Sequence, residues 1–207
     1  MKALQISNGF HEHNTKERIM NTAIQLFSKR GYDKVTMREI ASAVGINPAS
    51  IYYHFSSKKD LLTTIYAFYD RQQQELFPNV DDLLALAETA GFEQLLSVVD
   101  IHYSPPELDE MVNSIFSIAF REINTDSDSE KFIRKHIFDN INGLLKPMLT
   151  RMVELKKLEP FDIDTFLRIF NLVSLAGAAL YFSPMRLNDD TWRACLMFLF
   201  NTILPKK

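Results

Sequence analysis

Glycine, cysteine and long apolar runs are scarce in this chain, and each scarcity narrows the possible folds. Only six of the 207 residues are glycine, and no segment alternates apolar and polar residues, so we expect an all-α chain. The single cysteine, Cys195, excludes an intrachain disulfide and suits a reducing cytoplasm. We expect its thiol to be buried in an apolar helix. Charged residues interrupt every apolar run, which argues against a membrane-spanning helix.

The sequence also lacks the motifs that most enzymes and metal sites require. Its five histidines form no His-x-x-His or His-Glu-x-x-His pattern, so we expect no catalytic metal. Neither a glycine-rich phosphate loop nor a Gly-x-Ser-x-Gly sequence is present. The carboxylates fall mainly at expected helix starts and on solvated faces, where helix caps and surface charge explain them. We therefore expect neither an enzyme nor a cofactor.

Charge is distributed unevenly along the chain. The whole chain has a formal net charge of −3, which by itself does not favour binding to nucleic acid. Residues 1–60 hold nine basic and five acidic side chains, a net charge of +4, and the remaining residues have a net charge of −7. A basic segment on an acidic body is expected of a protein that meets DNA with one end only.

The segment from residue 36 to residue 62 predicts two short helices separated by a tight turn. Thr36 is a suitable N-cap, and Glu39 three residues later completes a capping box. Gly45 is placed to end this first helix in a left-handed conformation. The buried face of the helix is predicted from helical spacing to be Met37, Ile40, Ala41 and Val44. A helix-turn-helix of this kind places its second helix in the major groove of DNA.

The second short helix carries few charges and many small or aromatic side chains. Asn47 can cap this helix, and Pro48 suits its first turn. Ile51 and Phe55 lie one helical turn apart and are expected to face inward. Ala49, Ser50, Tyr53 and His54 are then expected to lie outside, with Tyr52 near the boundary. Among the candidate DNA contacts, only Asn47 and Arg38 suit bidentate hydrogen bonds with adenine or guanine. Readout of the DNA sequence is therefore expected to depend partly on thymine methyl groups and on DNA shape.

After the two short helices of this segment, a longer helix is expected to start at Lys58 and to be capped by Ser56 or Ser57. It is the fourth helix of the chain when the helix over residues 14–30 is counted. Lys58 and Lys59 lie in its first turn, where the helix macrodipole disfavours cations unless an anion is bound. Because helix N-termini bind phosphate, one interpretation is a DNA phosphate beside these lysines, and the other is a solvated lysine pair.

Five runs at fixed spacing carry a resemblance to a known family. They are Thr15–Tyr32 (TKERIMNTAIQLFSKRGY), Val35–Ala41 (VTMREIA), Val44–Ile46 (VGI), Ser50–Phe55 (SIYYHF) and Lys58–Leu62 (KKDLL). Together they resemble the DNA-binding domain of the TetR/AcrR family of bacterial regulators. The resemblance implies an all-α fold of nine or ten helices, with an N-terminal three-helix helix-turn-helix domain and a C-terminal helical domain for ligand binding and dimerisation.

The resemblance also implies DNA contacts, residue by residue. Thr36 matches a residue that bonds a phosphate from the start of the second helix, and Lys58 matches a phosphate-binding lysine that opens the fourth helix. Arg38 is a looser match, to a residue that reaches a base or a phosphate. The DNA-binding residues implied in this way are Thr36, Arg38, Asn47, Pro48, Ala49, Ser50, Tyr52, Tyr53, His54 and Lys58.

We divide the chain into three parts. Residues 1–13 are predicted to form a flexible arm, residues 14–60 the DNA-binding domain, and residues 61–207 the effector-binding and dimerisation domain. Helices are predicted over residues 14–30, 58–77, 81–90, 92–103, 106–123, 131–158 with a kink at Pro147, 161–182 and 190–203.

The last two helices are apolar around much of their circumference, which indicates either a monomeric core or an interface between subunits. The resemblance favours the interface, because the family dimerises through its last two helices as a four-helix bundle. The predicted interface residues are Phe166, Phe170, Val173, Gly177, Leu180, Tyr181, Trp192 and Phe200.

The middle helices are rich in aromatic residues, most of which are expected to be ordinary core. The resemblance implies that some of them line an effector pocket: Tyr66, Tyr69, Phe77, His102, Tyr103, Asn113, Phe116, Phe120 and His136. The resulting hypothesis is a cytoplasmic, homodimeric repressor that binds a palindromic operator in double-stranded DNA and is released by a small, largely apolar effector. The alternative is a constitutive DNA-organising or protein-binding module of the same fold.

Overall fold

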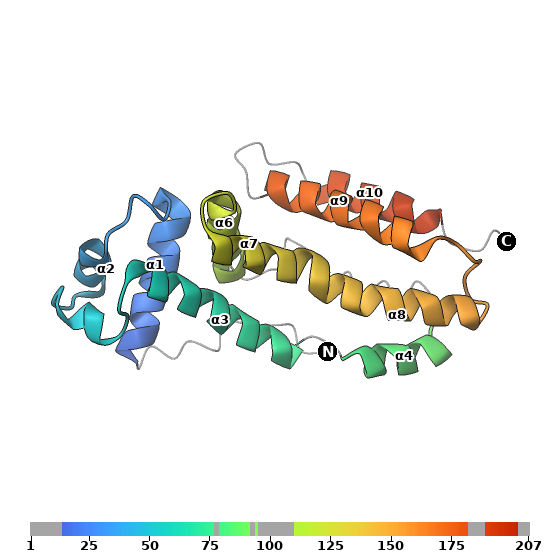
Figure 1. Cartoon of the computed structure of the whole chain (residues 1–207), viewed down its shortest axis with the longest axis horizontal. Helices are drawn as coiled ribbons and strands as arrows, with labels where there is room; N and C mark the ends of the chain where they lie inside the picture. The colour runs from blue at the N-terminus through green and yellow to red at the C-terminus, as the bar shows by residue number, and fades with distance from the viewer. Residues whose placement is uncertain (1–13, 77–78, 92–93, 95–109, 182–188, 203–207) are drawn as a thin grey trace. The chain divides into compact units, whose positions relative to one another are not determined.

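The computed structural model describes residues 14–76, 79–91, 94, 110–181 and 189–202, which form helices joined by turns and loops (Figure 1). No strand occurs within these residues, so the all-α prediction is confirmed. The predicted arm of residues 1–13 and most of the predicted helix over residues 92–103 lie outside the described residues.

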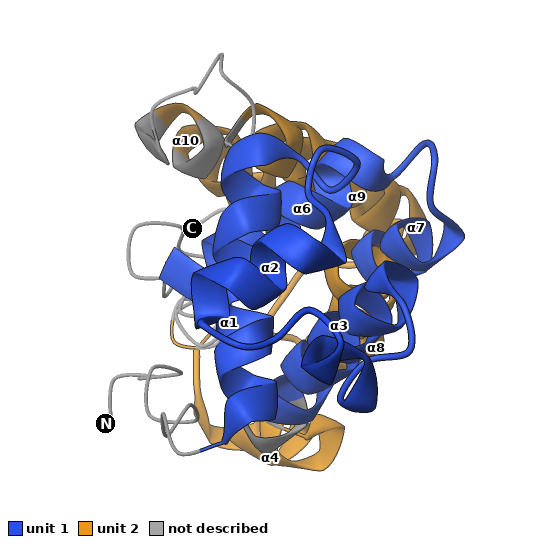
Figure 2. Cartoon of the chain, turned by 90° about the vertical axis from the view of Figure 1, so that its left-hand side faces the viewer, with its two compact units in different colours: residues 1–76, 108–133 blue, residues 77–107, 134–207 orange. Residues whose placement is uncertain are grey.

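Contacts divide the chain into two compact units, which Figure 2 colours separately. Unit 1 comprises Met1–Leu76 and Leu108–Ile133, and unit 2 comprises Phe77–Glu107 and Arg134–Lys207. Unit 1 therefore contains the helix-turn-helix segment together with helices from later in the chain. A DNA-binding domain that ends at residue 60 stays a prediction, because compactness does not define a functional boundary.

Unit 1 is built around a closely packed apolar core. Its elements are α1 (Thr15–Arg30), α2 (Met37–Val44), the 3₁₀ helix η2 (Ser50–Tyr53), α3 (Lys58–Leu76), α6 (Glu110–Glu122) and α7 (Ser127–Ile133). Helix α1 packs against α2, α3 and α6. The deeply buried side chains of unit 1 include Ile19, Ala23, Phe27, Ile40, Ala41, Ile51, Phe55, Leu61, Leu62, Ile65, Ile115 and Ile118. These side chains fix α2 and η2 on the body of the unit.

The ends of the first helices follow from local sequence. Asn14 caps α1, since its side chain accepts a hydrogen bond from the Lys16 amide. Thr36 and Glu39 form the predicted capping box at the start of α2, and Gly45 ends that helix with φ +79°. A left-handed residue of this kind favours glycine, which has no Cβ to clash with the backbone.

Unit 2 contains α4 (Val80–Thr89), the π-helical segment η4 (Arg134–Asp139), α8 (Asn140–Glu154), α9 (Ile163–Tyr181) and α10 (Asp189–Asn201). Helix α8 packs against α4 and α9, and α9 packs against α10. The core of unit 2 consists of Ala87, Ala90, Ile141, Leu145, Met148, Leu149, Met152, Leu158, Phe166, Leu167, Phe170, Leu196 and Phe200.

The predicted continuous helix over residues 131–158 was wrong in its bounds and its regularity. Helix α7 already begins at Ser127, because Asp126 caps it by accepting a hydrogen bond from the Ser129 amide at 2.8 Å. A π-helical segment interrupts the α-helical pattern, and α8 ends at Glu154. Lys156 follows in a left-handed conformation with φ +55°, while the Lys157 amide bonds back to the Met152 carbonyl.

Two further expectations are corrected in α9 and α10. Residues Ile163–Leu180 of α9 have the length and mean hydropathy, 1.4, that a membrane span requires, although only 22% of that segment is buried. The expectation that charge excludes every such segment was therefore wrong, since Asp164 and Arg168 both lie near the start of this one. Cys195 was expected to be buried but is exposed on α10. Both corrections indicate that these helices carry an apolar face toward solvent.

Candidate nucleic-acid interface

Helix α2 is held by contacts at both of its ends. At its C-terminus, Arg18 of α1 donates from Nη2 to the Val44 carbonyl at 2.7 Å, which satisfies an acceptor that the helix itself leaves open. At its N-terminus, the Thr36 hydroxyl accepts a hydrogen bond from the Glu39 amide at 3.2 Å, and Glu39 Oε2 accepts one from the Thr36 amide at 2.8 Å. These contacts fix the position of α2 within the chain in the absence of DNA.

The segment predicted as a short recognition helix folds as a turn followed by the four-residue 3₁₀ helix η2. Asn47 was predicted to cap a helix, but its Oδ1 accepts a hydrogen bond from the Ala49 amide at 2.8 Å and so starts the turn instead, while η2 begins later, at Ser50. Ile51 and Phe55 are buried as predicted and anchor the segment on the core. Tyr52 and Tyr53 project outward between these anchors.

The predicted DNA-binding residues are all at least partly accessible. Thr36, Arg38, Asn47, Pro48, Ala49, Tyr52 and Tyr53 are exposed, and Ser50, His54 and Lys58 are half-buried. The tyrosines stand out, with Tyr52 56% and Tyr53 89% exposed. Large aromatic side chains are seldom left in water without a role, so this exposure is consistent with a surface that another molecule covers.

Two of the predicted phosphate donors are engaged within the chain. The Thr36 hydroxyl donates to Glu39 Oε2 at 2.9 Å, and the Lys58 ammonium donates to backbone carbonyls of the loop that precedes α2. Arg30 also donates to Glu39 Oε1 at 2.7 Å. Hydrogen bonds from Arg30 first, and then from Thr36, lower the pKa of Glu39 to about 2. Phosphate contacts from Thr36 and Lys58 stay predictions.

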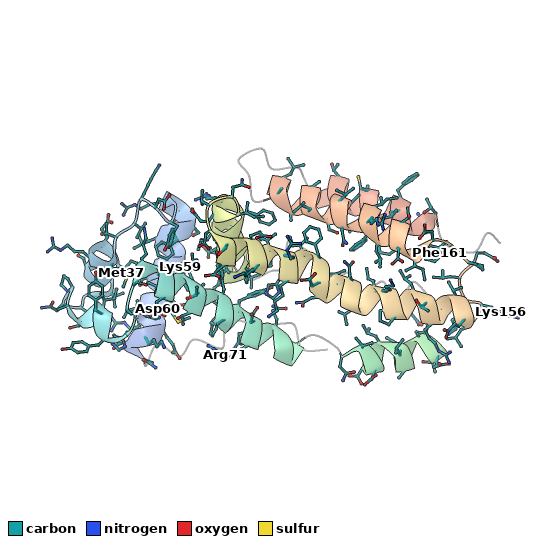
Figure 3. The ribbon with its side chains drawn as sticks, viewed as in Figure 1. Met37, Lys59, Asp60, Arg71, Lys156 and Phe161 are labelled. Atoms are coloured by element: carbon teal, nitrogen blue, oxygen red, sulfur yellow. The ribbon has the colours of Figure 1, made fainter. Side chains whose placement is uncertain are left out.

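Sequence reasoning missed a polar network that joins the start of α3 to the start of α7. Lys59 pairs with Asp126 and, at 2.8 Å, with Asp128. Asp126 Oδ2 accepts a hydrogen bond from the Ser129 hydroxyl, which lies 2.8 Å from the Tyr66 hydroxyl. Figure 3 labels Lys59 and Asp60 at this end of α3. The spacing of Asp126 and Ser129 is a capping pattern that could have signalled the helix start, but nothing local indicates the partner Lys59.

The environment of this network shifts its titrating groups. Burial raises the pKa of Tyr66, so the phenol stays protonated. Burial alone would also raise the pKa of Asp126, but hydrogen bonds from Lys59 and Ser129 outweigh it and lower that pKa. The network is therefore charged at neutral pH and holds α7 against α3.

A second link joins α6 to α1. Arg121 of α6 donates from Nη1 to the Ser28 carbonyl at 2.6 Å, close to the C-terminus of α1. Together with the Lys59 network, this bond ties the turn between α6 and α7 to α1 and α3. A movement of that turn would act on both helices.

The predicted effector-pocket residues belong to both units, and some lie outside the described residues. Tyr66, Tyr69 and Phe116 pack with Phe132 in unit 1, with ring centroids between 4.5 and 5.4 Å apart. Asn113 and Phe120 are half-buried on α6 of the same unit. His136 is buried in η4 of unit 2, where its Nδ1 lies 3.3 Å from Asn140 Nδ2. Phe77, His102 and Tyr103 lie outside the described residues. A pocket lined by these residues stays a prediction.

The predicted dimer-interface residues include three that the chain itself covers. Phe166, Phe170 and Phe200 are buried in the core of unit 2, where their rings pack together. Placing them on the interface was wrong, because side chains already covered within one chain cannot form its outer surface. Val173, Gly177 and Leu180 are half-buried. Tyr181 and Trp192 lie in α9 and α10, but their side chains lie outside the described part of the chain.

The exposed face of these two helices is formed by other apolar residues. On α9 it comprises Ile169, Leu172, Ala176 and Ala179, and on α10 Ala194, Cys195, Met197 and Phe198. We refer to these eight residues as the apolar stripe. Leu172 is 68% and Phe198 74% exposed. Contiguous exposed apolar surface of this kind marks interaction sites in soluble proteins.

Comparison with known proteins identifies the family of the helix-turn-helix. Residues 19–65 match the family model of the bacterial regulatory proteins of the tetR family. The chain is 40% identical over 70 residues, 34% of its length, to the transcriptional regulator YerO of Bacillus subtilis. It is 52% identical over 46 residues, 22% of its length, to the biofilm operon negative regulator IcaR of Staphylococcus aureus. The matched segments span 24% of YerO and 25% of IcaR.

Solved structures extend the likeness in fold beyond the matched segment. A TetR transcription regulator from Haloarcula marismortui superposes with a TM-score of 0.69 at 17% identity, over 92% of this chain and 98% of the other. A transcriptional regulator from Saccharomonospora viridis, solved in complex with choline, gives a TM-score of 0.65 at 23% identity over the same shares. The helix-turn-helix segment thus matches the tetR family of bacterial regulatory proteins, and the fold of the chain is similar to that of solved regulators.

Proposed function

We propose that the protein is a DNA-binding transcriptional repressor that acts as a homodimer on a palindromic operator. The observation that carries the proposal is the anchored η2 segment, which presents Tyr52 and Tyr53 to solvent between the buried residues Ile51 and Phe55. IcaR, which the chain resembles over 46 residues, is a negative regulator, and this supports repression.

The proposed DNA contacts divide into residues that recognise bases and residues that position the protein on the sugar-phosphate backbone. Arg38 and Asn47 are exposed and carry the groups that can form bidentate hydrogen bonds with bases. The phenols of Tyr52 and Tyr53 can donate to phosphates, and their rings can pack against sugars or thymine methyl groups. Pro48, Ala49, Ser50 and His54 complete the surface.

The apolar stripe supports dimerisation. Its α9 residues lie three or four positions apart, so they share one face of that helix, and α9 packs against α10 in the same unit. A second copy placing its own stripe on this face would form a four-helix interface with two-fold symmetry. A two-fold dimer requires operator half-sites one DNA turn apart, at about 34–36 Å.

Release by a small effector completes the proposal. The aromatic cluster around Tyr69 and Phe116 supplies the apolar surface on which such ligands are bound between helices. The regulator from Saccharomonospora viridis was solved with choline, and a gamma-butyrolactone receptor shares the fold with a TM-score of 0.60. An effector that prefers one arrangement of α6 and α7 would shift the population of DNA-binding conformers. A cytoplasmic location follows from this role.

Selection on a random duplex library tests the proposal. We expect the purified protein to enrich a palindrome with half-sites about one helical turn apart. Titration of that duplex with fractions of cell metabolites is then expected to identify a fraction that releases it. An enriched palindrome that no fraction releases would favour the constitutive DNA-organising alternative, and the absence of any enrichment, also after unfolding and refolding to remove bound ligand, would contradict DNA binding.

A further inference from the structure

The Lys58 ammonium faces the backbone of the loop between α1 and α2. Its Nζ lies 2.9 Å from the Tyr32 carbonyl and 3.1 Å from the Val35 carbonyl. A third carbonyl, that of Asp33, lies at 3.5 Å. The same nitrogen stands 4.2 Å from the centroid of the Tyr32 ring. One cation thus meets three carbonyls and one aromatic face of a single loop.

These contacts match the hydrogen-bonding capacity of the group. A lysine ammonium has three N–H donors and no acceptor, so three carbonyl oxygens can use all of them. The loop gains as well, because its carbonyls lie outside any helix and have few amides to pair with. Packing of the Tyr32 ring against Phe27, with centroids 5.1 Å apart, fixes the aromatic face on the core of unit 1. The ammonium therefore lies in a formed site with a rigid side.

The Lys58 contact joins two parts of the chain that flank α2 and η2. Tyr32 and Lys58 are 26 residues apart, and both α2 and η2 lie between them. Thr36, which caps α2, directly follows the carbonyl of Val35, and Ser57, which caps α3, directly precedes Lys58. The Lys58 contacts thus join the two ends of the segment that carries the DNA-reading residues.

We propose that Lys58 is a positioning residue of the DNA-binding surface rather than a ligand of a DNA phosphate. Its ammonium holds the loop before α2 against the first turn of α3 and so fixes the placement of α2 and η2 on the DNA. A phosphate could bind the ammonium only by taking a donor from at least one of its three carbonyl contacts. The inference rests on the proposed function, because it assumes that this surface binds DNA.

The dependence of DNA affinity on salt separates the two roles. Each phosphate contact that is lost reduces the slope of log affinity against log salt by about 0.9, hence by about 1.8 for a homodimer that loses two. Lys58→Met is expected to lower the affinity of the folded protein for the selected duplex by about fivefold or more, as loss of a positioning contact would, with an unchanged slope. Arg38→Met, which removes an exposed cation of α2 proposed to contact bases, is the contrasting variant and is expected to relax the base preference at one position of each half-site.

Specificity gives a second readout that a purely structural lysine would not change. With Lys58→Met, affinity for the selected duplex is expected to fall more than affinity for random duplex. Affinities are measured well below the unfolding temperature, so that loss of folded protein does not contribute. A slope reduced by about 1.8 would overturn the proposal in favour of a phosphate contact, and an unchanged slope with unchanged affinity would overturn any role of Lys58 in DNA binding.

Amide hydrogen exchange tests the loop without DNA. The Val35 amide donates to the Tyr32 carbonyl at 3.2 Å, so Lys58→Met is expected to accelerate its exchange about tenfold or more. The Gly45 amide at the end of α2 is the internal control and is expected to keep its rate. If Lys58→Met does not fold, Lys58→Gln, which retains two donors, is measured instead. Unchanged exchange at Val35 would refute the loop contact, whereas failure of the wild-type protein to bind any duplex would refute only the proposed DNA binding.

Discussion

Both units use a lysine to hold backbone carbonyls, but they differ in what they leave uncovered. In unit 2, Lys157 donates to the carbonyls of Ala87, Glu88 and Ala90 at 2.7 to 2.9 Å, much as Lys58 does in unit 1. The exposed large hydrophobic side chains of unit 1 are the tyrosines of η2. Those of unit 2 are Ile169 and Leu172 on α9 and Met197 and Phe198 on α10. The first set carries hydroxyl groups suited to a polar partner, and the second suits an apolar one.

Unit 2 also holds polar atoms that are buried without a hydrogen-bond partner. Among the described residues of unit 2, the Oδ1 atoms of Asn142 and Asn171 and the hydroxyl of Ser174 are buried without a hydrogen-bond partner. An oxygen that loses water and gains no donor costs about 1–3 kcal/mol. Two of these residues lie on α9, the helix that also carries half of the apolar stripe.

The largest expected effect contrasts two phenylalanines of unit 2. Phe170 is 1% exposed and Phe198 74% exposed. Phe170→Ala is expected to lower the free energy of unfolding by about 3–5 kcal/mol, because it leaves a cavity in the core. Phe198→Ala is expected to change it by no more than about 0.5 kcal/mol at concentrations where the protein is monomeric. Urea denaturation measures both, and similar losses would show that the apolar stripe is covered within one chain.

The next effect concerns assembly. Leu172→Glu introduces a charge at the 68% exposed position of the stripe on α9 and is expected to weaken the dimer at least tenfold, since burying an unpaired carboxylate is costly. Sedimentation velocity over a concentration series measures the change. Thr150→Glu, at an exposed position of α8, is the control. Should Leu172→Glu sediment as the wild type does, another surface must form the dimer.

A smaller effect depends on pH and tests the capping box of unit 1. The pKa of Glu39 is about 2 in the folded protein against an ordinary 4.5, so Glu39 binds its proton more weakly when folded. Its contribution to stability is complete above pH 4.5 and is lost as the pH falls toward 2. Glu39→Gln is expected to lower stability near neutral pH and to converge with the wild type at acid pH. Urea midpoints between pH 2 and pH 7 test this, and a difference independent of pH would contradict it.

The smallest expected effect is stabilising. Lys156 adopts φ +55° after α8, a conformation that glycine tolerates better than a residue with a Cβ. Lys156→Gly is expected to raise the free energy of unfolding by about 0.5 kcal/mol, since relief of strain exceeds the added entropy of the unfolded chain. Figure 3 labels this residue beyond the end of α8. Lys135→Gly within η4 is the contrasting control and is expected to destabilise.

Features set by neighbouring residues could be predicted from the sequence. The capping box of Thr36 and Glu39, the end of α2 at Gly45 and the burial of Ile51 and Phe55 all depend on residues within one or two turns. Such patterns have few alternatives, because each cap requires a particular residue type at a fixed spacing.

Features set by distant residues could not be predicted. The Lys58 and Lys59 contacts join positions 23 to 69 residues apart, and no residue near either lysine indicates its partner. The buried face of α9 was also assigned wrongly, since both faces of that helix are apolar and periodicity cannot choose between them. Packing of α9 against α8 and α10 determines which face is buried, with Phe166 and Phe170 inside and Leu172 outside.

The exposed Cys195 gives the natural sequence a single addressable thiol. It is the only cysteine in the chain, and it lies on the apolar stripe of α10. A maleimide dye or a nitroxide would therefore label one known position per chain without any background from other cysteines. The rate of that labelling reports directly on whether α10 is covered, and a pair of spin labels in an assembled protein would measure the separation of two α10 helices.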